Sequence, residues 1–232
     1  MTLKKNYDGI IPNSFFIGLI NPVELKNNGG VLEIQNIVKL GAVANYSKFE
    51  ADGTLEFNGD ATVWTDIFFS ISRARIPTSS APTWAVFTTN IKKYTFAVND
   101  YVYVGSSELA HTYKEGSNLY PHIHIYTNGV DVTDRTVKYK SNNIMCGVGA
   151  AAVEANFEKQ FTIPANTPDK THLLLQFDAV SGVGKTIGGD ICARFSRVVE
   201  DTGTAPSNDP FVSQLGIHIE QDTMGSRDII EK

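Results

Sequence analysis

The feature that most constrains this chain is the spacing of its apolar residues, which alternate with polar residues along most of the sequence. Alternation with a period of two places apolar side chains on one face of a β-strand, whereas an amphipathic helix repeats every three to four residues. Helical periodicity is hard to find, and the alternating runs are bounded by Gly, Asn, Asp and Pro, which favour turns. The pattern predicts an all-β fold.

The strands that we expect are short and recur along the chain. They span residues 31–39, 54–58, 62–73, 84–98, 101–104, 122–127, 135–140, 155–163, 172–179, 189–198 and 214–220. Strands of this length and number need two packed sheets, which predicts a jelly-roll-like antiparallel β-sandwich over residues 51–232. Residues 1–50 are rich in Asn, contain Pro12 and Pro22 and alternate weakly, so we expect an irregular N-terminal attachment arm or accessory segment there.

Composition argues against several classes of protein. The chain has 20 Lys and Arg residues against 25 Asp and Glu residues and no dense basic block, so we expect no nucleic-acid partner. The apolar run from Phe15 to Ile20 is too short for a membrane span or a secretion signal, so we expect a soluble, unprocessed protein without membrane insertion. Cys146 and Cys192 form no CxxC pair, so we expect reduced, buried thiols.

Three of the five histidines lie close together in the sequence, at His111, His122 and His124. On a strand, His122 and His124 share one face with Tyr126, while the intervening isoleucines share the other face. Two such imidazoles can bind a transition metal, with His111 as a third nitrogen donor. The spacing places no acidic ligand beside them. We therefore expect cross-strand hydrogen bonds or a subunit contact and no metal, with a metal ion at His122 and His124 as the alternative.

Signals for catalysis are weak. Residues 179–186 satisfy a relaxed phosphate-loop pattern, but such a loop needs a helix directly after it, and a strand-like run follows here. This indicates a Gly-rich β-turn with a solvated Lys185. The sequence has no GxSxG elbow and no recognisable triad, and Glu154 and Glu158 look like ordinary exposed charges. We therefore expect no catalytic residues, no cofactor and no enzyme, with an unrecognised hydrolase or metal-dependent enzyme as the minority alternative.

Aromatic residues gather on several of the expected strands. They are Trp64, Trp84, Tyr101, Tyr103, Tyr113, Tyr120 and Tyr126. Aromatic side chains on strands usually belong to a core or an interface, and a platform that stacks against sugars is the alternative.

Three segments carry a resemblance when they are taken together: ELAHTYKEGSNLYPHIHIY, GKTIGGDICARFSRV and LGIHIEQDTMGSRDIIEK. They resemble a family of tailed-bacteriophage virion proteins, over roughly residues 53–232. The matching residues are Leu109, His111, Tyr113, Lys114, Glu115, Gly116, Pro121, His122, His124, Cys192, Arg194, Asp222, Thr223, Met224, Gly225, Ser226 and Arg227. The middle departs from the family, because RTVKYKSNNIMCGVG stands where that family has a Trp-rich strand.

The resemblance implies a virion-associated β-sandwich, homotrimeric and without established catalysis, that serves as a head fibre, capsid decoration protein or tail component. We expect residues 1–50 to anchor it to other virion proteins of the capsid or tail after assembly in the host bacterial cytoplasm. The alternative is a tail-associated module that binds a host receptor or glycan. The turn at residues 114–116 is expected to lead into the histidine strand. Asp222 and Arg227 are expected to tie down the C-terminal segment.

Overall fold

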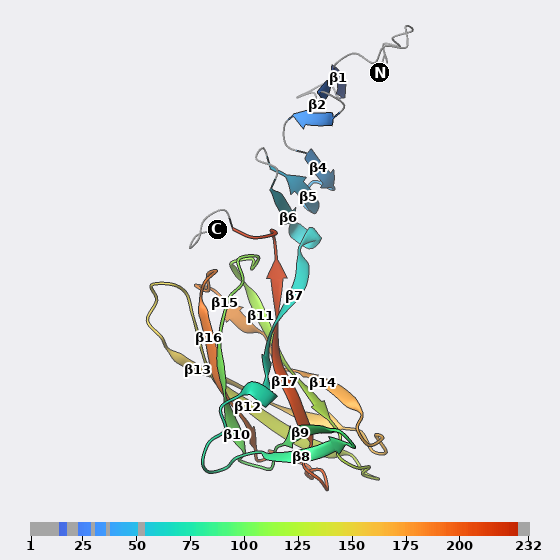
Figure 1. Ribbon diagram of the computed structural model, residues 1–232, viewed down its shortest axis with the longest axis vertical. Coiled ribbons are helices and arrows are strands. Elements are labelled where there is room, and N and C mark those ends of the chain that lie inside the picture. The colour runs from blue at the N-terminus through green and yellow to red at the C-terminus, as the bar shows by residue number, and fades with distance from the viewer. Residues whose placement is uncertain (1–13, 18–22, 29–30, 36–37, 51–53, 227–232) are drawn as a thin grey trace. The chain divides into compact units, whose positions relative to one another are not determined.

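The computed structural model describes residues 14–17, 23–28, 31–35, 38–50 and 54–226 (Figure 1). These residues form β-strands, turns and two short 3₁₀ helices, Gly59–Ala61 and Ile71–Arg73, with no α-helix among them. None of them belongs to a helix with the length and apolarity needed to cross a membrane. The chain divides into two units, residues 1–62 with 222–224, and residues 63–221 with 225–232.

The smaller unit contains two three-stranded antiparallel sheets. The first consists of β1 (Ser14–Ile17), β2 (Val23–Asn28) and β3 (Val31–Gln35), and the second of β4 (Val38–Gly41), β5 (Tyr46–Phe49) and β6 (Leu55–Asn58). The division falls after Thr62 rather than at residue 50, and Asp222 joins this unit because its carbonyl accepts a 2.6 Å hydrogen bond from the amide of Phe57. The described part of the expected arm therefore consists of short antiparallel strands. Arg227 lies outside the described residues.

The larger unit contains two antiparallel sheets (Figure 1). The four-stranded sheet has the order β10 (Tyr101–Glu108), β16 (Asp190–Val198), β12 (Arg135–Cys146), β13 (Glu154–Ile163). The seven-stranded sheet has the order β14 (His172–Gln176), β11 (Gly116–Tyr126), β17 (Phe211–Gln221), β9 (Ile91–Thr95), β8 (Thr83–Thr88), with β15 (Val180–Gly182) beside β11 and β7 (Val63–Ser70) beside β17. The expected all-β, jelly-roll-like antiparallel sandwich is confirmed.

The core lies between the two sheets. Ile123 and Ile125 of β11 are fully buried, as expected for alternate positions of a strand that is covered on one face. Phe195 of the four-stranded sheet stacks on Tyr139 with ring centroids 5.5 Å apart and also contacts Phe96 edge-on. One contiguous cluster of buried apolar residues includes members of both sheets. Burial of these side chains is the main favourable term that holds the sandwich together.

Several expectations about individual strands are wrong. The single strand expected over residues 84–98 is a hairpin, because Thr89 and Asn90 form a two-residue turn between β8 and β9. Polar residues such as Asn favour turns, and here this local preference interrupts a run that reads as continuous. The strand expected over residues 31–39 is divided between β3 and β4, which belong to different sheets, and β1, β2 and β5 lie outside the expected strands. The short strand β15 also lies outside them. Its Gly182 pairs with Gly116 of β11.

One buried cation fixes the loops at one end of the four-stranded sheet. The Arg197 side chain on β16 is only 1% exposed, and it lies 3.1 Å from Glu200 Oε1 and 2.7 Å from Asp209 Oδ1. Its guanidinium also donates a 2.8 Å hydrogen bond to the carbonyl of Phe96. A buried guanidinium needs such partners, because an unpaired charge in a protein interior is strongly destabilising.

We expect Arg197→Met to lower the free energy of unfolding by about 3–5 kcal/mol, because it leaves Glu200 and Asp209 without their cation. Urea unfolding followed by circular dichroism measures this. Arg73→Met, at an exposed arginine of the same unit, is the control and should change stability by no more than about 0.5 kcal/mol. A loss below about 1 kcal/mol for Arg197→Met would show that the cluster does not hold the loops.

Candidate functional site

The histidine strand is β11, and its side chains alternate as expected. Ile123 and Ile125 point into the core, whereas His122 and His124 lie on the opposite, outer face of the seven-stranded sheet. The strands β14 and β17, which pair with β11 at the two histidines, are both antiparallel to it. This pairing is what brings histidines from distant parts of the chain beside His122 and His124.

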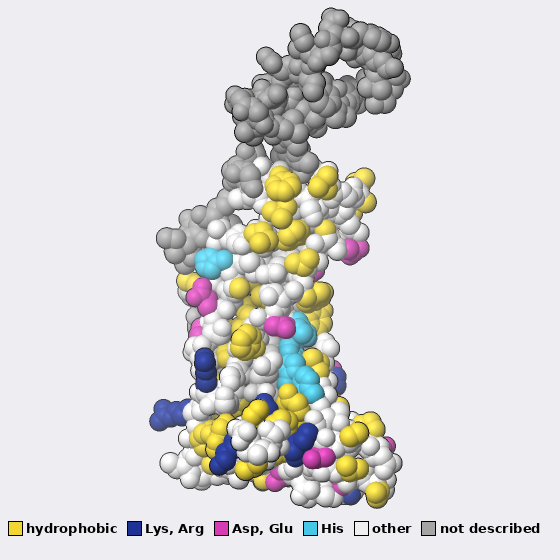
Figure 2. Space-filling view, turned by 45° about the vertical axis from the view of Figure 1, so that its right-hand side comes forward, with side chains coloured by type: hydrophobic (Ala, Val, Ile, Leu, Met, Phe, Trp, Pro, Cys, Tyr) yellow, Lys and Arg dark blue, Asp and Glu magenta, His cyan; other side chains and the backbone are white. Residues whose placement is uncertain are grey.

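Four of the five histidines form a row across three strands. His122 stacks on His218 of β17 with ring centroids 4.0 Å apart, and the rings of His122 and His124 meet edge-on at 5.0 Å. His124 Nδ1 lies 2.8 Å from His172 Nε2 of β14, so that one nitrogen donates a hydrogen bond and the other accepts it. Figure 2 shows a band of histidine side chains on one face of the larger unit. The expected cross-strand hydrogen bonding is thus present at His124.

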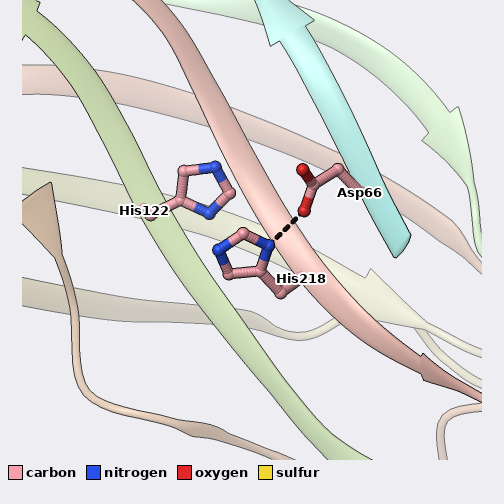
Figure 3. A group of neighbouring side chains, drawn as sticks. All are labelled: Asp66, His122 and His218. Atoms are coloured by element: carbon pink, nitrogen blue, oxygen red, sulfur yellow. Dashed lines mark hydrogen bonds and ion pairs between the residues drawn. The ribbon is translucent and has the colours of Figure 1, made fainter. Parts of the chain in front are cut away.

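A carboxylate stands at the end of the row. Asp66 of β7 is the register partner of His218, and its Oδ1 is hydrogen-bonded to His218 Nδ1 (Figure 3). One ligand atom each from Asp66, His122 and His218 can be chosen so that all three lie within 4.8 Å of one another. This group shares His122 with the alternative metal pair of His122 and His124, and it contains an acidic ligand, which the sequence spacing does not supply.

His122 is the buried member of this group. Its residue is 1% exposed, and its Nδ1 has no hydrogen-bond partner among the residues that the structure describes. Burial lowers the pKa of His122 to about 4, and the neighbouring His218 and His124 add to the effect. Burial also lowers the pKa of His124, with His172 contributing. His122 is therefore a neutral imidazole near pH 7, the form that offers a lone pair to a ligand.

Gly216 makes room for the His122 ring. It lies opposite His122 in the β11–β17 register, and a Cβ atom at this position would fall well inside contact distance of His122 Nε2. A strand glycine commonly marks such a close approach, since it adds no side chain of its own to the sheet. The sequence fragment LGIHIE therefore supplies both the space for one imidazole and, at His218, the ring that stacks on it.

The third expected nitrogen donor, His111, lies elsewhere. Its Nδ1 is hydrogen-bonded to the hydroxyl of Ser226, and its Nε2 is 3.4 Å from Glu108 Oε1. At the turn that enters β11, Lys114 Nζ lies 3.1 Å from Glu220 Oε2, and Glu115 Oε1 accepts a 2.9 Å hydrogen bond from the amide of Ile187. These contacts connect the turn to β17 and to the segment between β15 and β16. His111, Lys114 and Glu115 therefore take no part in the histidine row.

The remaining candidates do not join the histidine row. Lys185 lies in a turn between β15 and β16, so a strand follows the phosphate-loop pattern where a helix would be needed. Glu154 Oε1 accepts a 3.0 Å hydrogen bond from Asn142, and Glu158 Oε1 lies 3.0 Å from Lys138 Nζ. Cys146 and Cys192 are free and partly buried.

The aromatic residues separate into different environments. Tyr113 is fully buried in the core, and Tyr101 and Tyr103 contact each other on β10. Trp64 meets Tyr120 edge-on at 5.3 Å beside the histidine row. Trp84 lies 4.6 Å from Tyr94 between ring centroids, next to a surface hollow of about 250 Å³. The hollow is lined by Ser70, Ser72, Trp84, Lys92, Lys93, Tyr94, Val212, Ser213 and Gln214.

No protein-family model and no curated protein matches this chain. Among solved structures, it is similar to an exo-β-1,3-galactanase from Phanerochaete chrysosporium, with 12% identity and a TM-score of 0.35 over 84% of this chain. The match covers 36% of the galactanase. A CBM35 from Cellvibrio japonicus Abf62 also has 12% identity and a TM-score of 0.35, over 70% of this chain and 99% of its own.

A third similar structure is that of infectious bursal disease virus, Gt strain, with 11% identity and a TM-score of 0.27, over 85% of this chain and 43% of the viral chain. At these identities and TM-scores the likenesses carry no statement about the fold or the function of this chain.

We expect Gly216→Ala to destabilise the protein by about 1–3 kcal/mol, because the added methyl group meets the His122 ring. The double variant Gly216→Ala/His122→Ala should recover at least about 1 kcal/mol of this loss in a double-mutant cycle, measured by urea unfolding. Gly105→Ala is the matched control, since a Cβ there has no neighbour within 4 Å, and it should not destabilise. Strict additivity of the two changes would mean that His122 does not occupy this space.

Proposed function

We propose that this chain is an accessory structural protein of a tailed-phage virion, a head fibre or capsid decoration protein that works as a homotrimer and without catalysis. The observation that carries the proposal is the apolar character of the outer face of the seven-stranded sheet. Trp64 is 57% exposed and Phe68 is 65% exposed, and both occupy outward positions of β7. Leu174 of β14, the register partner of His124, is 47% exposed.

Large apolar side chains that gather on one sheet face favour an interaction, whereas single exposed ones are ordinary. Removing apolar surface from water contributes about 25 cal/mol of favourable free energy per Å². Association that covers this face is therefore favoured. A second copy of the chain is the occupant that we propose, because closed symmetric assemblies bury the same patch on every subunit. The resemblance of the histidine and C-terminal segments to phage virion proteins supports the same assignment.

The smaller unit supplies the proposed attachment to other virion proteins. Among the described residues, β1 and β3 each pair only with β2. An edge strand presents backbone amides and carbonyls that can pair with a strand of another chain. Short sheets with two such edges are suited to docking against a partner protein.

We expect the purified chain to form a trimer of its 25.4 kDa subunit at micromolar concentration, as measured by light scattering after size exclusion. Replacing Trp64 and Phe68 together by Gln should weaken the trimer at least about tenfold, since the apolar surface would be lost. Val132→Gln, at a 77% exposed loop residue, is the control and should leave the mass unchanged. A strictly monomeric parent that also fails to bind phage heads or tails would contradict the proposal.

The second candidate function is binding of a host-surface glycan, and the hollow beside Trp84 favours it. Two aromatic rings, Trp84 and Tyr94, lie beside Lys93, Ser213 and Gln214 in its lining. Lys93 Nζ donates a 3.0 Å hydrogen bond to Ser213 Oγ, and burial lowers the pKa of this lysine. Apolar rings with a few fixed polar groups are the combination that orients small ligands in pockets, sugars included.

If this hollow binds glycans, Trp84→Ala should weaken binding to host cells or to a glycan array by at least about tenfold, which corresponds to about 1.4 kcal/mol. Tyr103→Ala is the control, because this 46% exposed aromatic residue lies on β10 and is not part of the lining. Equal binding by the parent and Trp84→Ala would exclude this hollow as the site. Absence of binding by the parent would exclude the second function.

A further inference from the structure

We infer that Asp66, His122 and His218 bind one divalent transition-metal ion of the zinc class, with solvent completing its coordination. The inference concerns ions bound by a single chain and does not rest on the proposed trimer. It starts from the three strands β7, β17 and β11, which lie side by side and present these residues on the same outer face. None of the three residues is adjacent to another in the sequence.

The donor set suits such an ion. Two imidazole nitrogens and one carboxylate oxygen are ligands that Zn²⁺ uses at about 2.0–2.2 Å, and three protein ligands leave a fourth position for water. Imidazole also suits Cu²⁺ and Ni²⁺, whereas Mg²⁺ and Ca²⁺ prefer oxygen donors alone. Two nitrogens in a set of three therefore select a transition metal.

The distances between the ligand atoms need only a small adjustment. The three ligand atoms lie within 4.8 Å of one another, and ligands of a tetrahedral Zn²⁺ ion are about 3.4 Å apart. Rotation of the Asp66 and His218 side chains supplies this movement, since these side chains are 49% and 30% exposed and lie at the surface. His122 is the fixed member, buried over Gly216.

His122 also provides a second observation that points to a ligand. A buried imidazole nitrogen usually has a partner, but His122 Nδ1 has none among the described residues. An ion that binds this atom therefore displaces no hydrogen bond from it. His124 and His172 are different, because they already satisfy each other through their 2.8 Å hydrogen bond. This contrast places the ion at the β7 end of the row.

A bound ion would join β7 to β11 across β17. Asp66 and His218 are register partners on adjacent strands, and His122 stacks on His218 from the other side of β17. Because the unfolded chain does not hold the three ligands together, binding should favour the folded state by mass action. Thermal stability therefore reports on the site independently of any activity.

The test uses the full chain, prepared without a histidine tag, stripped with a chelator and dialysed. Titration calorimetry with ZnCl₂ should give one ion per chain, and Zn²⁺ at about 100 times Kd should raise Tm by roughly 5–10 °C. Co²⁺ in place of Zn²⁺ should give the visible absorption of a low-coordinate site. Absence of saturable Zn²⁺ binding by the parent would overturn the inference.

The variants target the two surface ligands, whose replacement leaves the core intact. Asp66→Asn and His218→Gln should each weaken Zn²⁺ binding at least about tenfold and abolish the Tm rise. His111→Gln is the matched control, since it also leaves four histidines and alters a histidine that is paired with Ser226 and Glu108. It should bind Zn²⁺ as the parent does.

His172→Gln separates the two halves of the row, because His172 contacts His124 and not the proposed ligands. It should retain binding within about threefold of the parent. Loss of binding in His172→Gln together with full binding in His218→Gln would move the ion to the His124–His172 pair and overturn the assignment. Far-UV circular dichroism of each variant checks that the sandwich remains folded.

Discussion

The register of β17 against β11 on one side and β7 on the other is the constraint on which the outer face of the sandwich depends. Side chains on a strand alternate with a period of two, so a shift of one residue would exchange the two faces. In the register present, Ile217 and Ile219 enter the core while His218 points outward between His122 and Asp66. The apolar face of β17 thereby determines which polar residues meet on its other face.

This dependence explains what the sequence predicts and what it does not. The alternation of apolar and polar residues is a local pattern, so it can be read from the sequence. It indicates the strands, the two-sheet sandwich and the strand face that His122 and His124 share. Pairing between strands is not local, since Asp66 and His218 are 152 positions apart. The sequence therefore offers no means to place His218 or Asp66 beside His122. A hint exists in Gly216, two residues before His218, because a glycine inside an alternating strand suggests a close approach.

The hairpin within residues 84–98 illustrates the opposite case, where a local signal is present but weak. Thr89 and Asn90 are polar residues in an otherwise strand-like run, and they contain neither Gly nor Pro. Two-residue hairpin turns usually have Gly or Asn at their centre, so Asn90 alone carries the signal. By contrast, nothing in the local sequence indicates that Arg197 is buried. Its partners Glu200 and Asp209 reach the guanidinium only when the loops that carry them fold against it.

The proposed association and the proposed metal site share one surface, and their energies are therefore coupled. Trp64, Asp66 and Phe68 occupy successive outward positions of β7. A second chain that covers the two aromatic residues also removes Asp66 from water. Desolvation of a carboxylate and its partner imidazole costs free energy that their mutual attraction often fails to recover. A dication bound by Asp66, His122 and His218 would neutralise the carboxylate and replace its lost hydration. Occupancy of the site should therefore favour coverage of this face, and by linkage coverage should tighten the site by the same factor.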